Sequence, residues 1–566
     1  MSPDLVVLNS KIYTLDAKDT LAQAVAVKDG RFLAIGSDAE IAKLAGPNTQ
    51  RIDLGGRAVI PGIFDSHVHM LEAGAKLSAI RLDECTSPEE MMELVRERAR
   101  VTPPGAWIIG QGWNEGNFAQ KRLPTRHDID PATSEHPVIL MRFFNTDVVN
   151  SYALRMAGID HHTPDPEGGK VERDADPQDT LKGCGAPNGL LRASAKGLVR
   201  RLIPPPTTQQ IKESLRLGCQ EMHRFGITSV VEPGLRPPEI RAYQSFYQDG
   251  GLTVRTSLMP SWHGFYQNEE EAQLDDRARA LGIFTGLGDE WLRIGGLKMA
   301  IDGGTTPHTA YMYEPYEGDA ELVAFNRLSV PDLHRYFRTA QELGWDVGIH
   351  CCGDHAQDLA VDAFATVARE VPRPDARHSI IHAYFPTPRA LDQMAHYRIA
   401  AVIQPTFIYW EGDALFRDVG ERRAQNYKPV RKYLDHGVVV TASSDEPSTV
   451  SVNPFVALYA LVTRKNKLGQ YVAPQEAISR QEALQLYTMG GTWLTREERL
   501  KGTIEIGKLA DMAVLDRDYF AVPDEEIKDI QADMTIVGGK VVWERELPSR
   551  KLRAFGKVER EAKHGK

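Results

Sequence analysis

The chain has 566 residues, of which 42% are hydrophobic and 25% are charged, and its formal net charge is −10. A single hydrophobic core stops growing at roughly 250–300 residues, so we expect at least two structural units. This balanced composition excludes a disordered chain. The modest, dispersed negative charge offers no cluster of Lys and Arg for nucleic acid, so a small-molecule partner is expected. The oligomeric state is left open, with a homo-oligomer as one option.

The N-terminal segment, the apolar stretches and the cysteines indicate the cellular compartment. The opening MSPDLVVLNS has no basic segment followed by an apolar run, and no stretch approaches the roughly 18 apolar residues that span a bilayer. Five cysteines at irregular spacing fit a reducing compartment, so we expect a cytoplasmic protein without membrane partners. Adjacent Cys351 and Cys352 could bind metal or titrate, but we favour small buried hydrophobes.

The first 56 residues are read as short strands with tight turns. VVLNSKIYTL is followed by AVAVKDGRFLAIG, whose Asp29-Gly30 pair is a hairpin signal, and then by RIDLGG. Near the other end, LADMAVLD and MTIVGGKVVWE repeat this pattern with a Gly538-Gly539 turn. We expect the two ends to combine into one composite β-sandwich domain.

Between these ends lie eight short apolar, strand-like runs, each followed by polar or helical sequence. Eight such units are typical of a (β/α)8 TIM barrel, so the expected fold class is α/β. Two helix-like stretches, TTQQIKESLRLGCQEMHRFG and VPDLHRYFRTAQELG, are expected to end at Gly226 and Gly344. The predicted strands are residues 58–69, 227–232, 252–259, 292–299, 345–351, 378–383, 398–404 and 437–445.

One connection breaks the regular pattern. The segment after the first strand is too long for a single crossover, so we expect a large insertion with its own strands, such as AWIIGQG and PVILMRFF. The predicted domain limits are 1–56 for the first part of the β-sandwich, 57–71 for barrel strand 1, 72–205 for the insertion, 206–490 for the rest of the barrel, 491–552 for the second part of the sandwich and 553–566 for a C-terminal tail.

Five of the eight predicted strands end in a residue type that binds metal ions. The carboxyl ends of the strands form the active-site face of a TIM barrel. In an extended chain, residues i and i+2 point the same way, so His67 and His69 can reach one ion. Each candidate alone has an ordinary explanation as a hydrogen-bonded or solvated residue, but together they favour a metal-dependent hydrolytic site. The other strand ends carry Lys298, His350, His382 and Asp445.

The motifs at these positions resemble those of a known family. VIPGIFDSHVH, SSDEP and TIEIGKLADMAVLD are similar to the amidohydrolase superfamily. GQGWNE, PVILMRFFNTDVVNSYAL, GLLRASA and KMAIDGG resemble its amidohydrolase 3 branch, which contains N-substituted formamide deformylase and related metal-dependent amidases. The resemblance runs from about Leu5 to about Trp543. It implies an amidohydrolase-type barrel and a composite β-sandwich.

The resemblance also implies roles for the strand-end residues. His67 and His69 are the implied ligands of a first metal ion. Asp445 is implied as a further ligand of that ion and as the proton acceptor. His350 and His382 are the implied ligands of a second ion.

Lys298 matches a position that relatives carboxylate. An unmodified ammonium group has no lone pair and repels a dication, so it is a poor ligand. A carbamate formed with carbon dioxide would instead present two oxygens that could bridge two ions. A buried lysine paired with a carboxylate such as Asp302 is the alternative.

Some positions depart from the pattern of that branch. Many relatives have His where this chain has Asn145, and many have Glu where it has Ala193. Because an amide cannot shuttle protons, substrate handling in the insertion is expected to differ. Glu232, at the end of the second predicted strand, is read as a structural or supporting carboxylate rather than a metal ligand.

Three residues are candidate substrate contacts: Trp113, Asn145 and His308. His308 follows the Lys298 strand, where relatives often have Arg or His, and a surface hydrogen-bonding His is the alternative. Trp113 and Trp262 are candidate pocket walls, with core packing as the alternative.

The expected protein is a metal-dependent amidohydrolase that cleaves a carbon–nitrogen (amide-type) bond of a small molecule. One or two divalent ions, with zinc favoured, would activate water, and Asp445 would move its proton to the leaving nitrogen. One alternative is a deaminase or a cyclic amide or imide hydrolase on the same barrel. Another is a catalytically inactive barrel acting as a binding or regulatory protein. The substrate is not predicted, because pocket specificity lies in loops.

Overall fold

The computed structural model describes residues 2–142, 146–174, 185–263, 274–318, 324, 326–449 and 451–546. The chain divides into two compact units. We call Met1–Met70 with Cys219–Lys566 the barrel unit, and Leu71–Gly218 the inserted unit. A search of the described residues found no helix with the length and apolar character needed to cross a membrane.

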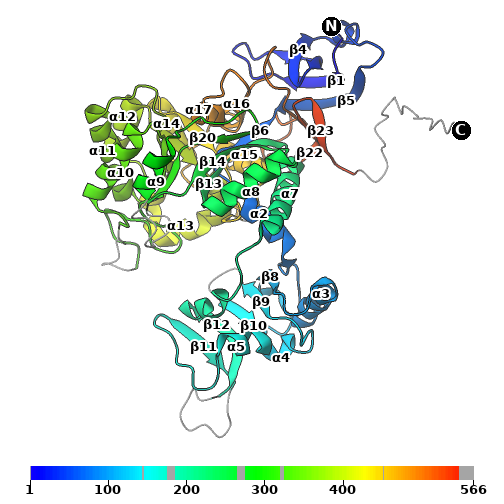
Figure 1. The fold of residues 1–566 in the computed structure, drawn as a ribbon. Helices are drawn as coiled ribbons and strands as arrows, with labels where there is room; N and C mark the ends of the chain where they lie inside the picture. Colours follow the sequence, from blue (N-terminus) through cyan, green and yellow to red (C-terminus); the bar gives the residue numbers. More distant parts are fainter. Residues whose placement is uncertain are drawn as a thin grey trace, which may run out of the picture. The chain divides into compact units, whose positions relative to one another are not determined.

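Strands from both ends of the chain form one continuous sheet in the barrel unit. The strand order is β23-β22-β21-β5-β1-β3-β4, and β2 pairs with β1. Figure 1 shows the blue β5 from the N-terminal part close to the red β22 and β23 from the C-terminal part. One apolar core therefore includes residues from both ends, such as Val7 and Val514. The bounds are β1 Leu5–Tyr13, β2 Leu21–Ala22, β3 Ala24–Lys28, β4 Arg31–Gly36, α1 Asp38–Ala42, β5 Gln50–Pro61, β21 Met512–Leu515, β22 Ala532–Val537 and β23 Lys540–Glu544.

Both predicted hairpin turns in this sheet are present. Asp29 and Gly30 connect β3 to β4 with φ angles of 50° and 75°. Gly538 and Gly539 connect β22 to β23 with φ angles of 55° and 73°. Two consecutive positive φ angles fit a two-residue hairpin whose twist matches the flanking strands.

The barrel strands are parallel and buried, as expected for strands covered by helices. Their hydrogen bonds form two runs, β15-β14-β13-β6 and β16-β17-β18-β19-β20. The strands are β6 Ile63–Asp65, β13 Ile227–Leu235, β14 Arg255–Pro260, β15 Leu292–Ile294, β16 Leu297–Ala300, β17 Val347–Cys351, β18 Ser379–His382, β19 Ala400–Ile403 and β20 Val440–Ala442.

Backbone contacts join these two runs at both sides. Between β14 and β16, Ser261 forms a parallel bridge with Lys298, and the Trp262 N–H donates to the Lys298 carbonyl at 2.8 Å. Between β6 and β20, the Ser66 N–H donates to the Ala442 carbonyl at 3.3 Å. The strands therefore close into a ring, and β15 and β16 together supply its fourth strand.

Helices alternate with the barrel strands. Local sequence sets their ends: α10 is capped by the Ser329 side chain with Pro331 in its first turn, and Gly344 with φ 81° follows its end. The helices of this unit after β13 are α8 Pro237–Gln248, α9 Leu274–Leu281, α10 Val330–Glu342, α11 Asp354–Glu370, α12 Pro388–Tyr397, α13 Thr406–Ala424, α14 Val430–Asp435, α15 Pro454–Thr463, α16 Arg480–Leu486 and α17 Met489–Leu494.

The inserted unit has its own mixed sheet and its own apolar cores. The strand order is β11-β12-β10-β9-β8-β7, with parallel pairing only for β7–β8 and β8–β9 among the described strands. The strands are β7 Ile80–Arg81, β8 Ile108–Trp113, β9 Val138–Arg142, β10 Thr146–Val149, β11 Gly169–Arg173 and β12 Pro187–Ala193. The helices of this region are α2 Met70–Ser78, α3 Pro88–Val101, α4 Arg126–Ile129, α5 Ser151–Ala157, α6 Gly197–Arg200 and α7 Thr208–Arg224.

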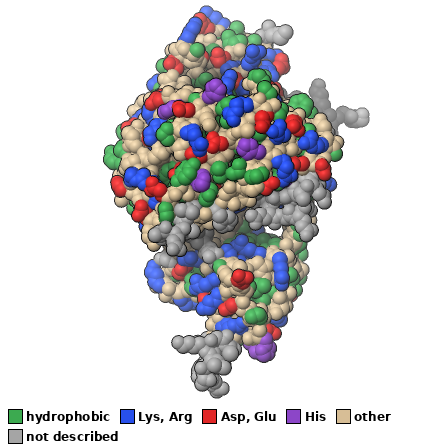
Figure 2. Space-filling model, turned by 90° about the vertical axis from the view of Figure 1, so that its left-hand side faces the viewer, with side chains coloured by type: hydrophobic (Ala, Val, Ile, Leu, Met, Phe, Trp, Pro, Cys, Tyr) green, Lys and Arg blue, Asp and Glu red, His purple; other side chains and the backbone are tan. Residues whose placement is uncertain are grey.

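On the face of the barrel unit that Figure 2 shows, Lys and Arg side chains are interspersed with Asp and Glu side chains. The dispersed charge of the sequence is thus also visible on that face. The expected absence of nucleic-acid partners stays a prediction.

The predicted fold class is confirmed: the chain is an α/β protein with a (β/α)8 barrel, a composite β-domain from both termini and a large insertion after the first barrel strand. Three predicted strands are divided or shorter in the structure. The run 58–69 divides at Gly62, where an added Cβ would lie 2.3 Å from the Thr228 hydroxyl oxygen. The run 292–299 divides at Gly295 and Gly296, and the eighth strand ends at Ala442 rather than 445.

Candidate metal centre

Three predicted ligands converge where β6 and β20 end. His67 Nε2 and His69 Nε2 lie 3.5 and 3.4 Å from Asp445 Oδ1. A tetrahedral zinc ion with bonds of about 2.0–2.1 Å has ligand atoms about 3.3–3.4 Å apart. The two distances to Asp445 Oδ1 match this spacing, and all three ligand atoms lie within 4.8 Å of one another. The donor set of two imidazoles and a carboxylate is suited to zinc and its first-row neighbours.

Asp65 holds the two ends of this cluster together. It is the last residue of β6, and its carboxylate accepts the N–H of His67 at 3.2 Å and the N–H of Ser444 at 3.1 Å. The Asp445 N–H also donates to the His67 carbonyl at 2.9 Å. Burial raises the pKa of the Asp65 carboxyl to about 7, against the opposing effect of these hydrogen bonds.

Lys298 lies beside the same cluster, as the second residue of β16. Its side chain is 1% exposed, and its Nζ is 3.5 Å from His67 Nε2. Burial lowers the pKa of the Lys298 amine to about 7, although the charge of Asp445 opposes the shift. A neutral amine is the form that reacts with carbon dioxide.

A second cluster lies at the carboxyl ends of β17 and β18. His350, Cys352 and His382 each present one ligand atom, and these atoms lie within 4.8 Å of one another. The ring centroids of His350 and His382 are 4.2 Å apart, and those of His382 and His67 are 5.7 Å apart. The two clusters are therefore neighbours at the carboxyl ends of the strands.

Polar groups orient the residues of the second cluster. Gln404 Oε1 lies 2.8 Å from His382 Nδ1, so it can accept that proton and leave Nε2 for an ion. The Asp302 carboxylate accepts the backbone N–H groups of Tyr311, Cys352 and Gly353 at 3.0, 3.0 and 2.7 Å. These are the bonds that fix the loop after β17.

Burial keeps the histidines in the form that binds metal. It lowers the pKa of His350 to about 3 and holds the pKa values of His67 and His382 well below the usual value, with Lys298 adding to each shift. Neutral imidazole has the free lone pair that a cation needs.

Three residues at this site have a strained backbone. His382, Ala383 and Asp445 have φ angles of 77°, 48° and 59°. L-residues rarely adopt such angles, and in proteins they gather at functional sites that the surrounding structure holds in place.

Other predicted site residues lie elsewhere or are untested. Trp113 is 0% exposed in a core of the inserted unit, and its Nε1 donates to the Leu140 carbonyl at 2.9 Å. This burial favours the core-packing alternative, and substrate contact by Trp113 stays a prediction. Asn145 lies outside the described residues. Glu232 accepts the Met70 N–H at 2.7 Å and the Tyr243 hydroxyl at 2.9 Å, as a supporting carboxylate does.

For His308 and Trp262, both interpretations, substrate contact and ordinary packing or hydrogen bonding, remain open. His308 Nε2 lies 3.4 Å from Asp418 Oδ1, and its ring stacks on Tyr316 at 4.5 Å. Trp262 is 4% exposed, and its Nε1 has no hydrogen-bond partner among the described residues. Substrate contact by either residue stays a prediction.

The sequence reasoning missed Gln404 and Lys428, and it favoured Cys352 as a small buried hydrophobe over a metal ligand. Lys428 is fully buried, with Nζ 3.7 Å from the ring centroid of Tyr384 and 3.4 Å from Gln404 Oε1. Burial lowers the pKa of its amine to about 7. Cys352 had a usable signal, since it follows His350 by two residues just as His69 follows His67.

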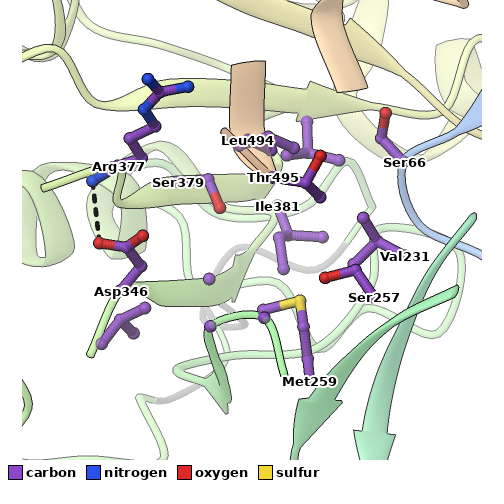
Figure 3. Close-up of a pocket in the computed structure, with 15 residues that line it drawn as sticks. Ser66, Val231, Ser257, Met259, Asp346, Arg377, Ser379, Ile381, Leu494 and Thr495 are labelled. Atoms are coloured by element: carbon purple, nitrogen blue, oxygen red, sulfur yellow. Dashed lines mark hydrogen bonds between the residues drawn. The ribbon is translucent and has the colours of Figure 1, made fainter. Parts of the chain in front are cut away.

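A cavity lies inside the barrel, and none of the candidate ligands lines it (Figure 3). The hydroxyls of Ser257, Ser379 and Thr495 line it, and many of its other residues precede or begin their strands. It has room for about two water molecules. Because barrel enzymes act at the carboxyl ends of the strands, we do not assign the catalytic site to this cavity.

Comparisons with known proteins agree with this architecture. A family model described as "Amidohydrolase family" matches residues 50–543. The Bacillus subtilis (strain 168) protein named "Putative amidohydrolase YtcJ" is 29% identical over 547 residues, which cover 94% of this chain and 98% of that protein.

Two further proteins are similar over nearly their full lengths. N-substituted formamide deformylase of Arthrobacter pascens is 27% identical, with 96% of this chain and 98% of that protein covered. The crystal structure of an uncharacterized metal-dependent hydrolase from Pyrococcus furiosus has a TM-score of 0.73 and 26% identity, and the match covers 91% of this chain and 99% of that one.

Proposed function

Because the chain belongs to the amidohydrolase family, we propose that it is a metal-dependent hydrolase that cleaves an amide-type carbon–nitrogen bond of a small molecule. One observation carries this proposal: one ligand atom from each of His67, His69 and Asp445 lies within 4.8 Å of the other two on the carboxyl side of the barrel, and both imidazole Nε2 atoms are 3.4–3.5 Å from Asp445 Oδ1. The similarity to N-substituted formamide deformylase, whose name describes an amide substrate, supports the bond type.

His67, His69 and Asp445 would hold a first divalent ion, with zinc as the proposed metal, and His350 and His382 a second. When bound, such ions supply a Lewis acid that polarises the scissile carbonyl and makes water more acidic. Asp445 would accept a proton from the attacking water and transfer it to the leaving nitrogen. The sum is amide plus water giving a carboxylic acid and an amine.

Lys298 would join the two centres after reaction with carbon dioxide. The neutral amine adds to the carbon of carbon dioxide and loses one proton, which gives a carbamate with two oxygens. The burial of Lys298 and its 3.5 Å distance from His67 Nε2 support this role. An anionic group between two cations would also reduce their mutual repulsion.

Metal analysis of ligand variants tests the first centre. The purified protein should contain about one to two equivalents of divalent ion. His67→Ala and Asp445→Ala should abolish hydrolysis of a panel of N-substituted amides and lower the metal content. His436→Ala, which changes an exposed histidine, should do neither.

Circular dichroism should show that these variants keep their fold. A wild-type protein without metal, and without gain of activity on adding zinc, manganese or cobalt, would refute the proposal. Near-normal turnover by either ligand variant would do the same.

Carbon-13 NMR tests the modification of Lys298. Protein loaded with metal and labelled bicarbonate should show a carbamate signal that Lys298→Ala lacks and that Lys540→Ala, a change on the exposed β23, retains. Removing carbon dioxide and metal should lower activity, and adding both should restore it. If fully active protein shows no carbon-13 carbamate signal at Lys298, the carbamate is excluded. The proposal for the first metal centre would be unaffected.

A further inference from the structure

Cys352 lies beside both histidines of the second cluster. It follows β17 directly, two residues after His350, and its side chain is 1% exposed. Its Sγ is 3.5 Å from His350 Nε2, and the cluster also includes His382. Cys351 is buried as well, but it belongs to neither candidate metal cluster among the described residues.

The spacing fits a shared ion. Zinc–sulfur bonds are about 2.3 Å and zinc–nitrogen bonds about 2.0–2.1 Å, so the two ligand atoms of a tetrahedral site lie about 3.5–3.6 Å apart. The measured separation of Cys352 Sγ and His350 Nε2 is 3.5 Å. The two side chains are thus already at the distance that a common ion requires.

The main chain of Cys352 is fixed independently of any ion. Its N–H donates to Asp302 Oδ1, and the N–H of Gly353 donates to Asp302 Oδ2. Gly353 also permits the chain to pass Tyr311, since an added Cβ would lie 1.8 Å from the Tyr311 carbonyl oxygen. The position of Cys352 therefore follows from the loop itself.

We propose that the Cys352 thiolate is a further protein ligand of the second metal centre, beside His350, His382 and the proposed carbamate of Lys298. This inference rests on the proposed function, which places a metal on the two histidines. The thiolate adds a soft donor to the two imidazoles, which favours zinc or cobalt over the oxygen-preferring manganese and magnesium. On binding, the S–H bond breaks, the sulfur–metal bond forms, and one proton is released to solvent.

Binding also requires a change at His350. Its Nε2 lies 3.2 Å from the Gly303 carbonyl, which can accept a proton from that nitrogen. When Nε2 binds the ion, the imidazole proton moves to Nδ1. The exchange replaces one hydrogen bond by one metal bond.

Cobalt spectroscopy of the full-length chain tests the thiolate. Protein reconstituted with cobalt should bind two ions and show a sulfur-to-cobalt charge-transfer band in the near ultraviolet. Cys352→Ser should lose that band, keep one tightly bound ion and bind the second about tenfold or more weakly. Cys351→Ser is the matched control, because it removes the neighbouring buried thiol, and it should keep both the band and the stoichiometry.

The outcomes separate this inference from the proposed function. Two bound ions with no charge-transfer band in the wild type, or a band that Cys352→Ser retains, would overturn the thiolate ligand and leave the hydrolase proposal standing. A wild type that binds no ion would overturn both. If Cys352→Ser fails to fold, Cys352→Ala replaces it in the test. The wild-type spectrum is also sufficient alone, because a cobalt-loaded wild type without the charge-transfer band would show that Cys352 is not a ligand.

Discussion

At the scale of single residues, buried polar atoms behind the candidate ligands set the properties of the site. Gln404 Oε1 is 2.8 Å from His382 Nδ1 and 3.4 Å from Lys428 Nζ. The ammonium form of Lys428 lies among the rings of Tyr384, Phe407 and Tyr427. No carboxylate within ion-pair distance is found for Lys428 in the described chain, so its charge is offset by aromatic faces and an amide oxygen.

Lys428→Met should therefore raise the free energy of unfolding at neutral pH. With a folded pKa of about 7 against 10.5 for an ordinary lysine, the unfolded chain holds one more proton between these values. Stability of the wild type thus increases with pH across this window, and the cost of the buried charge is full below about pH 7. At pH 7 the gain from the substitution should be on the order of a few kcal/mol, and it should shrink toward pH 10.

Denaturant unfolding of both proteins from pH 6 to pH 10 measures this difference. Lys501→Met is the contrasting variant, because Lys501 is also buried but its Nζ lies 3.0 Å from Glu497. Removing Lys501 leaves a buried carboxylate without that partner and should destabilise the protein. A Lys428→Met variant that is less stable than the wild type at pH 7 would contradict the prediction.

At the scale of elements, the loops that follow the barrel strands carry the chemistry, and single glycines control their paths. Gly353 precedes α11 and lies against the Tyr311 backbone. A Cβ added at Gly353 would lie 1.8 Å from the Tyr311 carbonyl oxygen. A side chain at this position would therefore require the backbone at Gly353 or Tyr311 to shift.

Gly353→Ala should consequently destabilise the protein by about 2–3 kcal/mol or more, because backbone rather than a flexible side chain must move. Gly197→Ala is the control, since Gly197 begins α6 with no atom within 4 Å of the added Cβ and should change stability by less than about 1 kcal/mol. Thermal unfolding compares the two variants. Equal midpoints would mean that the Tyr311 contact relaxes freely.

The elements differ in how far the sequence could predict them. Long apolar runs such as 227–232 and 345–351 became β13 and β17, because continuous burial favours parallel strands. The ends of the strands were harder to predict. His67 and His69 lie after β6, and Asp445 lies after β20 in a positive-φ conformation. Extended chain was predicted there because local pattern does not report where a ladder of hydrogen bonds stops.

The candidate site was predictable only in part for a similar reason. His67, His69 and His382 are polar residues in apolar surroundings, which makes them visible in the sequence. Lys428 and Gln404 are not, since a lysine in a loop is usually solvated and a glutamine carries no signature of its partner. Their roles come from tertiary contacts between segments that are far apart in the chain.

At the scale of the whole molecule, one buried ion pair ties the barrel to the composite sheet within the barrel unit. Arg255, in β14, donates to Asp511 through Nε at 2.7 Å and through a terminal nitrogen at 3.1 Å. The Gly538 N–H donates to the same carboxylate at 2.8 Å, and the Gly62 N–H to the Asp511 carbonyl at 2.9 Å. Asp511 therefore connects three segments: the turn between β22 and β23, the start of the barrel at Gly62, and β14.

Arg255→Met should lower the free energy of unfolding by about 3–5 kcal/mol, because it leaves Asp511 buried without its cation. The loss should depend little on salt, since buried pairs are weakly screened. Arg216→Met removes an exposed pair with Glu213 and should cost less than about 1 kcal/mol. Denaturant unfolding at low and high salt measures both, and similar losses for the two variants would contradict the special role of Asp511.

The pairing of β5 with β21 has a consequence for how the protein is made. Ile60 pairs with Ala513, so β5 cannot complete its ladder until almost the whole chain has been synthesised. At roughly 5–20 residues per second, the roughly 450 intervening residues take on the order of 20–90 s. During that time the nascent chain presents an open strand edge, which is a template for pairing with other chains. Translation that stops before β21 therefore yields a barrel with an uncovered β5, and the last strands to leave the ribosome protect the first ones.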